Sequence, residues 1–231
     1  MADGFAGFPK DFFAFFRELK ANNNRAWFED NKQRYRDSVQ APTGAFVSAM
    51  APEMKKISKH FICDPKPNGG SAFRIYRDIR FSKDKRPYKE NAGCFFQYAG
   101  SAGIHAPGFY MHFAANDVRY GGGSYMPEAP ALAKIREAIV AKPAAWKKIE
   151  ADKLFKKTFG EISGDALSRP PRGYDPQHPL IETIKRKSFF AIHPSTMALA
   201  QSPKLVADVA STFRAATPLM KFLCAAQGVP F

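Results

Sequence analysis

Cysteine is scarce in this sequence, which has only three among its 231 residues. Cys63, Cys94 and Cys224 are odd in number, lie far apart and include no Cys-x-x-Cys pair. This excludes a disulfide framework and a cysteine zinc site, and the five histidines show no ligand spacing either. We therefore expect no metal, no cofactor and a cytoplasmic protein, because unpaired thiols are typical of a reducing compartment.

Long apolar runs are also missing. No stretch approaches the roughly 18 apolar residues of a membrane-spanning helix. The first residues lack the basic region of a signal peptide, and the apolar patch Phe12–Phe16 is flanked by charges, which fits one face of a helix. We expect no contact with a membrane.

Acidic residues are outnumbered by basic ones. Lys and Arg total 35 and Asp and Glu 21, so the formal net charge is 35 − 21 = +14. Such a balance favours anionic partners such as nucleic acid, nucleotides or acidic proteins. The alternative is that the extra lysines only keep the protein soluble, and net charge alone does not decide between the two.

Hydrophobic residues repeat with a helical period towards both ends of the chain. Helices are predicted near residues 8–21, 24–39 and 42–61, with Asn24 as an N-cap and a kink or break at Pro52. Further helices are predicted to begin near residues 127, 143, 203 and 218.

The period changes to two in the middle of the chain, as in strands. Strands are predicted at 73–81, 93–99, 109–114, 118–120 and 188–193. Helices, then strands, then helices argue for an α+β fold, an antiparallel β-meander sheet flanked by N-terminal and C-terminal helices. We predict a single domain over residues 1–231, with a boundary in the proline-rich loop at 160–176 as the weaker alternative.

The densest group of charged side chains is the run from Arg74 to Lys89, which holds seven basic and two acidic residues. On a strand, arginines at alternate positions would project from one face, and their guanidinium groups match the oxygens of phosphate and carboxylate. Arg77 falls on the apolar side and needs a partner there. We predict an anion pocket on the sheet. Its predicted ligand-binding residues are Arg74, Tyr76, Arg77, Arg80, Lys85, Tyr88, Lys89, Trp27 and Asn31.

Three functions fit this cluster. The one we favour is binding of, or a reaction on, a phosphate-bearing or other anionic small molecule. The second is sequence-nonspecific nucleic-acid binding over the whole basic surface, including Lys147–Lys157, which predicts a steep loss of affinity with salt. The third is a non-catalytic interaction protein whose arginines only organise the fold. The sequence reveals no reaction and no oligomeric state.

Catalytic residues are not evident. His178 titrates near neutrality and could act as a general acid or base, although a histidine beside prolines is more often structural. Asp78 could hold Mg²⁺ together with Asp84, but the surrounding cations favour salt bridges. The glycines at 121–123 are interpreted as a flexible connector between a strand and a helix, because no Gly-Lys-Ser/Thr follows them.

Several of these blocks resemble the family called domain of unknown function 2461. They are Asn23–Phe28 with Asn31 and Tyr35, the run Arg74–Lys89, Gly121–Gly123 with the helix that follows, and Pro171–Asp175 with His178. The similarity extends from about residue 8 to residue 190, and the second block is the most specific. The resemblance implies an uncharacterised protein of bacteria and fungi with no assigned activity, so no catalytic residues carry over.

Overall fold

The computed structural model describes residues 4–100 and 106–231. The chain begins with helices α1 (Lys10–Ala21), α2 (Arg25–Asp30), α3 (Lys32–Tyr35) and α4 (Ala41–Ile57), with a π-helical turn, η1 (Arg36–Gln40), before α4. Strands β1 (Asn91–Gln97), β2 (Gly108–Ala114) and β3 (Asp117–Ser124) follow. Helices α5 (Ala129–Ala141), α6 (Pro143–Ala151), α7 (Lys153–Phe159) and α8 (Ile181–Ile184) lead to β4 (Phe189–Ser195), α9 (Met197–Ala200) and α10 (Leu205–Gln227).

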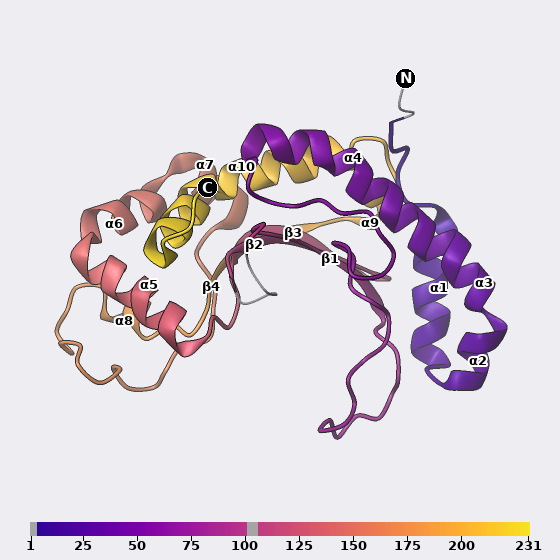
Figure 1. The fold of residues 1–231 in the computed structure, drawn as a ribbon, viewed down its shortest axis with the longest axis horizontal. Coiled ribbons are helices and arrows are strands. Elements are labelled where there is room, and N and C mark those ends of the chain that lie inside the picture. The colour runs from indigo at the N-terminus through magenta and orange to yellow at the C-terminus, as the bar shows by residue number, and fades with distance from the viewer. Residues whose placement is uncertain (1–3, 101–105) are drawn as a thin grey trace.

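The strands form one antiparallel sheet in the order β1-β2-β3-β4, which confirms the predicted α+β class and meander. Figure 1 shows the sheet as an arch, with α4 and α10 over its convex face, α1–α3 at one end and α5, α6 and α8 at the other. No described helix lies under the middle of the concave face, which we call the open face. Within the described ranges, no helix has the length and apolar composition of a membrane span.

The convex face of the sheet is apolar because every second residue of β2 points to the helices. Phe109, Met111 and Phe113 are fully buried, and the ring of Phe109 lies 4.5 Å from that of Phe213 in α10. Burying one such side chain contributes about 1.5–3 kcal/mol. A second apolar cluster, centred on Trp146, lies between α5–α8, β4 and α10, so α10 contributes to both clusters.

Most predicted helices are confirmed, but two proline-based boundaries are wrong. Asn24 caps α2 as expected, accepting a hydrogen bond from Trp27 N (3.0 Å). However, α4 continues through Pro52 and α10 continues through Pro218. Both helices bury residues on either side of their proline, and this tertiary packing outweighs the lost backbone hydrogen bond. The basic segment 147–157 is divided between α6 and α7 at Asp152, which caps α7.

The glycine connector predicted at 121–123 is also wrong, since these residues belong to β3. A Cβ atom at Gly121 would lie 1.8 Å from the carbonyl oxygen of Ala191 in the neighbouring β4, and Gly123 has a φ of +154°. Glycine therefore lets β4 approach the twisted end of β3. These residues do not form a phosphate-binding loop.

Candidate anion-binding site

The prediction of a strand at 73–81 is wrong. Residues 74–90, which we call the arm, form a narrow hairpin that projects beyond the β1 edge of the sheet, at the lower right of Figure 1. Backbone hydrogen bonds join the base of the arm: Arg77 N donates to Pro87 O (2.9 Å), and Lys89 N donates to Ile75 O (2.7 Å). The base is therefore a short antiparallel pair.

Beyond this base the arm turns on its own side chains. The carboxylate of Asp78 accepts a hydrogen bond from Arg80 N (3.2 Å), and that of Asp84 accepts one from Arg86 N (3.0 Å). Such local bonds compete with a β-ladder. The alternating sequence pattern therefore predicted a longer strand than the chain forms.

Arg77 finds the partner that its position on the apolar side requires. Its guanidinium donates to the carboxylate of Asp84 (2.8 Å) and to the carbonyl of Arg86 (3.0 Å). Arg86 in turn binds both Asp84 (2.7 Å) and Glu90. The hydrogen bonds from Arg86, and then those from Arg77, hold the pKa of Asp84 well below its usual range. These pairs stiffen the arm.

Two further cations in the arm are paired within it. Arg80 forms a two-pronged ion pair with Asp78 (3.0 and 2.7 Å), which lowers the pKa of Asp78 to about 2. The ammonium group of Lys85 donates to Ile79 O (3.0 Å). Asp78 and Asp84 both form ion pairs with arginines, and these pairs compete with a magnesium ion for the two carboxylates.

Arg74 and Lys89 differ from the other cations of the arm. Lys89 Nζ donates to the carbonyl of Arg74 (2.9 Å) and lies 5.3 Å from the centre of the Phe73 ring. Burial, and then the charge of Arg74, lower the pKa of Lys89. Among residues 4–100 and 106–231 neither side chain has an ion pair with a carboxylate. The charge of Arg74 contributes only the smallest of the causes that lower the pKa of Asp78. Two adjacent cations therefore lie together without a direct ion pair to a described carboxylate.

Aromatic rings fasten the base of the arm to α2. Tyr88 is buried and stacks on Phe28 at 4.1 Å, while Tyr76 lies 5.5 Å from Tyr88 and is 47% exposed. The side-chain amide of Asn23 pairs with the backbone N–H and carbonyl of Tyr88, both at 3.1 Å. Burial raises the pKa of Tyr88. Tyr88 is thus an anchor, and Tyr76 is the ring that remains accessible.

Trp27 and Asn31 are the two predicted ligand-binding residues that lie outside the arm. Trp27 packs on Phe15 at 5.6 Å, and the side chain of Asn31 donates to Trp27 O (2.9 Å) between α2 and α3. The ring contacts of α2 with the arm go through Phe28 instead. Trp27 and Asn31 therefore position α2, which carries the arm.

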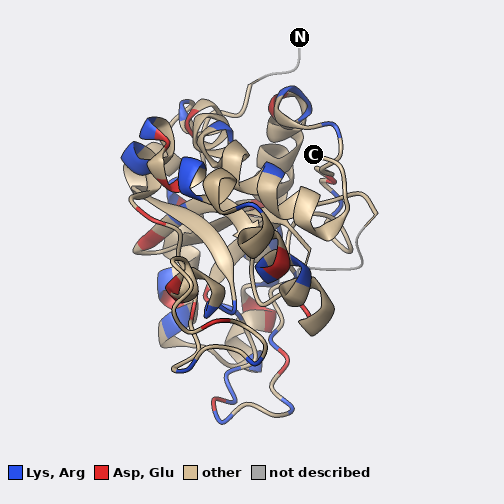
Figure 2. Cartoon of the chain, turned by 90° about the vertical axis from the view of Figure 1, so that its left-hand side faces the viewer, with Lys and Arg blue, Asp and Glu red and all other residues tan. Residues whose placement is uncertain are grey.

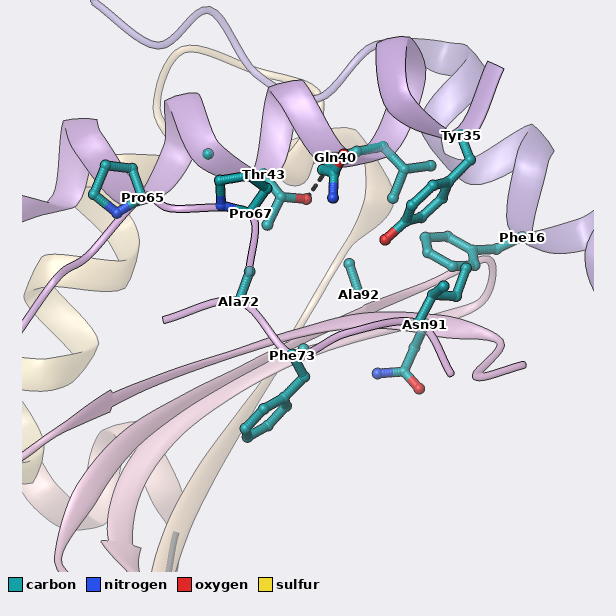
Figure 3. Close-up of a pocket in the computed structure, with 14 residues that line it drawn as sticks. Phe16, Tyr35, Gln40, Thr43, Pro65, Pro67, Ala72, Phe73, Asn91 and Ala92 are labelled. Atoms are coloured by element: carbon teal, nitrogen blue, oxygen red, sulfur yellow. Dashed lines mark hydrogen bonds between the residues drawn. The ribbon is translucent and has the colours of Figure 1, made fainter. Parts of the chain in front are cut away.

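The open face of the sheet continues from the base of the arm. Figure 3 shows Phe73 and Asn91 on the lower side of the strands, away from Tyr35 and Thr43. A Cβ atom at Gly93 would lie 2.9 Å from the Phe73 ring, so glycine lets this ring lie flat on the sheet. The Phe73 and Tyr110 rings are 6.3 Å apart.

A polar network that the sequence did not predict crosses the open face. Tyr110 Oη lies 3.0 Å from His112 Nδ1, and Asp117 lies 3.5 Å from His112 Nε2 and 3.3 Å from Arg119. Burial, and then the charge of Arg119, lower the pKa of His112, and burial raises that of Tyr110 to about 12. The signal was present: Tyr110 and His112 alternate with the core residues of β2.

The two candidate catalytic residues are not brought together. Asp78 is in the arm, whereas His178 is in the loop between α7 and α8, at the other end of the sheet (Figure 1). His178 Nδ1 accepts a hydrogen bond from Leu180 N (3.1 Å) and so has a structural role. It lines a cavity of about 460 Å³ with Glu137, Val140, Ala141, Gly173, Tyr174 and Asp175.

A second cavity lies between α4 and β1, and Figure 3 shows its lining. It offers about 20 Å³ between side chains such as Tyr35, Thr43 and Ala92, which is room for roughly one water. The Thr43 hydroxyl donates to Val39 O (2.7 Å). This space is too small for a ligand.

In the described part of the chain, no group of three or more His, Cys, Asp or Glu side chains could hold a metal ion. The sequence matches a family described as conserved hypothetical protein (DUF2461) over residues 11–222. No curated protein and no solved structure shows significant similarity. The match spans nearly the whole chain and includes the arm, so the protein belongs to the DUF2461 family.

Proposed function

We propose that the base of the arm binds a phosphate-bearing or other anionic ligand against the open face of the sheet. The observation that carries this proposal is the pair formed by Arg74 and Lys89, two adjacent cations that form no direct ion pair with a described carboxylate. Their mutual repulsion is unfavourable, and the attraction of a bound anion to both cations would offset it.

The surroundings of this pair suit a ligand that has an apolar part. Phe73 lies under the Lys89 ammonium and is 36% exposed, and Tyr76 is accessible in the adjoining turn of the arm. In this proposal Arg77, Lys85 and Tyr88 hold the shape of the arm. Arg80 is exposed and can exchange Asp78 for the ligand. We propose binding without assigning a reaction.

We also propose a cytoplasmic location and a single domain. The location is supported by the three thiols, which are all free. The single domain is supported by α10, which contributes buried residues to both apolar clusters.

The test is to remove both charges, with Arg74→Gln and Lys89→Met in one variant, and to measure binding of pyrophosphate and ATP by calorimetry. A hydrogen bond to a charged group contributes about 1.5–3 kcal/mol, and about 1.4 kcal/mol is tenfold in affinity, so we expect the loss of two such groups to weaken binding at least roughly 100-fold.

The matched control removes two exposed charges from α7, with Lys153→Gln and Lys157→Met. We expect this control to bind as the unmodified protein does. Equal weakening in both variants would mean that net charge alone attracts the ligand. An unmodified protein that binds neither probe would also overturn the proposal.

A further inference from the structure

Phe81, at the tip of the arm, is the most exposed of the large hydrophobic residues that the structure describes. Its exposed fraction is 94%, and that of the next, Met126, is 57%. A single exposed apolar residue is ordinary. This one, however, ends a projecting hairpin, and the guanidinium of Arg80 lies 5.7 Å from the centre of its ring.

The tip is held in a defined shape. The Arg77–Asp84 ion pair crosses the arm at 2.8 Å, and Lys85 binds the carbonyl of Ile79 just before the tip. The base is anchored by the stack of Tyr88 on α2. A ring presented by a stiff arm loses little conformational entropy on binding, which favours affinity.

Accessible rings and cations follow one another from Phe73, just before the arm, to the tip of the arm. Phe73, Tyr76 and Phe81 become more exposed from base to tip, at 36%, 47% and 94%. Arg74 and Lys83 are exposed, and neither has an ion pair with a described carboxylate. In Figure 2 the arm is the loop at the bottom, where Lys and Arg predominate over Asp and Glu. This arrangement fits a partner with repeated negative charges and flat rings.

We infer that the ligand is a single strand of nucleic acid, and this inference rests on the proposed anion site at the base of the arm. A base stacks on Phe81, and phosphates contact Lys83 near the tip and Arg74 at the base. Arg74 lies at the base of the arm and Phe81 seven residues further along the chain, so the two are at most roughly 23 Å apart at about 3.3 Å per residue. A nucleic-acid strand of several nucleotides can reach both over any separation up to that limit.

Two other macromolecules fit the arm less well. A base pair in a duplex has its faces covered by its neighbours, so stacking on a side chain favours unpaired bases. An anionic membrane would have to accept the tip among apolar chains, yet Asp78 and Asp84 lie close to Phe81 in the sequence and carry charge. One phenyl ring also offers little apolar area for insertion.

The test measures binding of a fluorescent oligothymidylate strand to the Phe81→Ala, Phe81→Leu and Phe81→Trp variants. Stacking of one base on an aromatic ring corresponds to an affinity change of about 5- to 150-fold. We expect a loss in that range for Phe81→Ala and Phe81→Leu, and full affinity for Phe81→Trp with quenching of the introduced indole. Since the side chain is exposed, all three variants should keep the Tm of the unmodified protein.

Two controls make the result specific. Leu154→Ala removes an apolar side chain on α7 that is 55% exposed, and it should leave affinity unchanged. Lys83→Ala should reduce the slope of log affinity against log salt by about 0.7. Full affinity in Phe81→Ala, or in Phe81→Leu, would overturn the inference, as would Phe81-dependent binding to phosphatidylserine vesicles without binding to the strand.

The inference and the proposed function can fail separately. Pyrophosphate binding that depends on Arg74 and Lys89, together with strand binding that is indifferent to Phe81, would leave the anion site standing alone. Strand binding that depends on Phe81 but not on Arg74 and Lys89 would place the ligand at the tip and remove the proposed site at the base.

Discussion

The arm and the loop at residues 160–180 lie at opposite ends of the sheet, and both fall within the residues that match the family. Each has little regular structure beyond isolated β-bridges, such as Tyr76 with Tyr88 in the arm and Ser163 with Phe190 in the loop. The arm projects and is shaped by ion pairs, whereas the loop returns to β4 and lies beside α5. Two regions with little regular structure have therefore formed a projecting hairpin in one case and a packed loop in the other.

The two regions differ most clearly in the number and sign of their charged side chains and in the ion pairs that these form. The arm holds seven cations and three carboxylates, those of Asp78, Asp84 and Glu90, and some of the cations form no ion pair with a described carboxylate. In the loop, Asp175 faces a cavity that it shares with Glu137 and His178, and no lysine or arginine lines that cavity. The distribution of charge therefore favours the arm over the cavity as the place of the proposed anion site. Net charge alone would not have separated the two regions.

Phe28→Ala tests how far the arm depends on α2 and should have the largest effect. It removes a fully buried ring and its stack with Tyr88, so we expect about 3–5 kcal/mol of lost stability in urea denaturation. Tyr174→Ala is the counterpart in the loop, where the ring is only partly buried, and should cost less than half as much. Equal costs would mean that the two regions are equally anchored.

Arg136→Met tests the anchoring of the loop and should have an intermediate effect. The Arg136 guanidinium donates to the carbonyls of Ile184 (2.7 Å) and Arg186 (3.1 Å) at the end of α8. Leaving such acceptors without a partner costs about 1–3 kcal/mol, measured as a lower free energy of unfolding. Pyrophosphate affinity should not change, which is the opposite of the result expected for Arg74→Gln. The exposed Arg172→Met is the control for loss of one charge.

Features of the fold that depend on residues close together in the sequence could be predicted, and those that depend on residues far apart could not. The helix α1 and the strand β2 follow from their own hydrophobic period, and Asn24 signals the start of α2. The glycines of β3 could not be placed, because the backbone that approaches Gly121 belongs to Ala191.

The candidate site shows the same limit. Arg74 and Lys89 belong to the predicted set because the cluster is dense in sequence. The ion pair between Arg77 and Asp84 and the hydrogen bond from Asn23 to Tyr88 both depend on a hairpin geometry that the alternating pattern did not predict. The composition of the sequence therefore located the cluster, and the ion pairs within the folded arm determine which of its cations have no direct carboxylate partner among the described residues.

The pKa of Lys89 gives the smallest expected effect, and it is the test that reports directly on the base of the arm. Burial and the charge of Arg74 lower this pKa below its ordinary value of 10.5. Arg74→Gln removes the second cause, so the pKa should rise while staying below 10.5 because burial remains. NMR titration of the lysine side chains measures this shift. Lys32, whose pKa is raised by its hydrogen bond to Glu29, should not move and is the internal control.

A bound anion should raise the same pKa, because negative charge favours the protonated ammonium. In the free protein the folded state loses this proton before the unfolded state does, so the free energy of unfolding increases as pH rises from the lowered pKa to 10.5. Saturating pyrophosphate should reduce that increase and move the Lys89 titration upward. If pyrophosphate binds and the Lys89 titration does not move, the anion occupies another part of the molecule. The base of the arm is then not the anion site that distinguishes it from the loop.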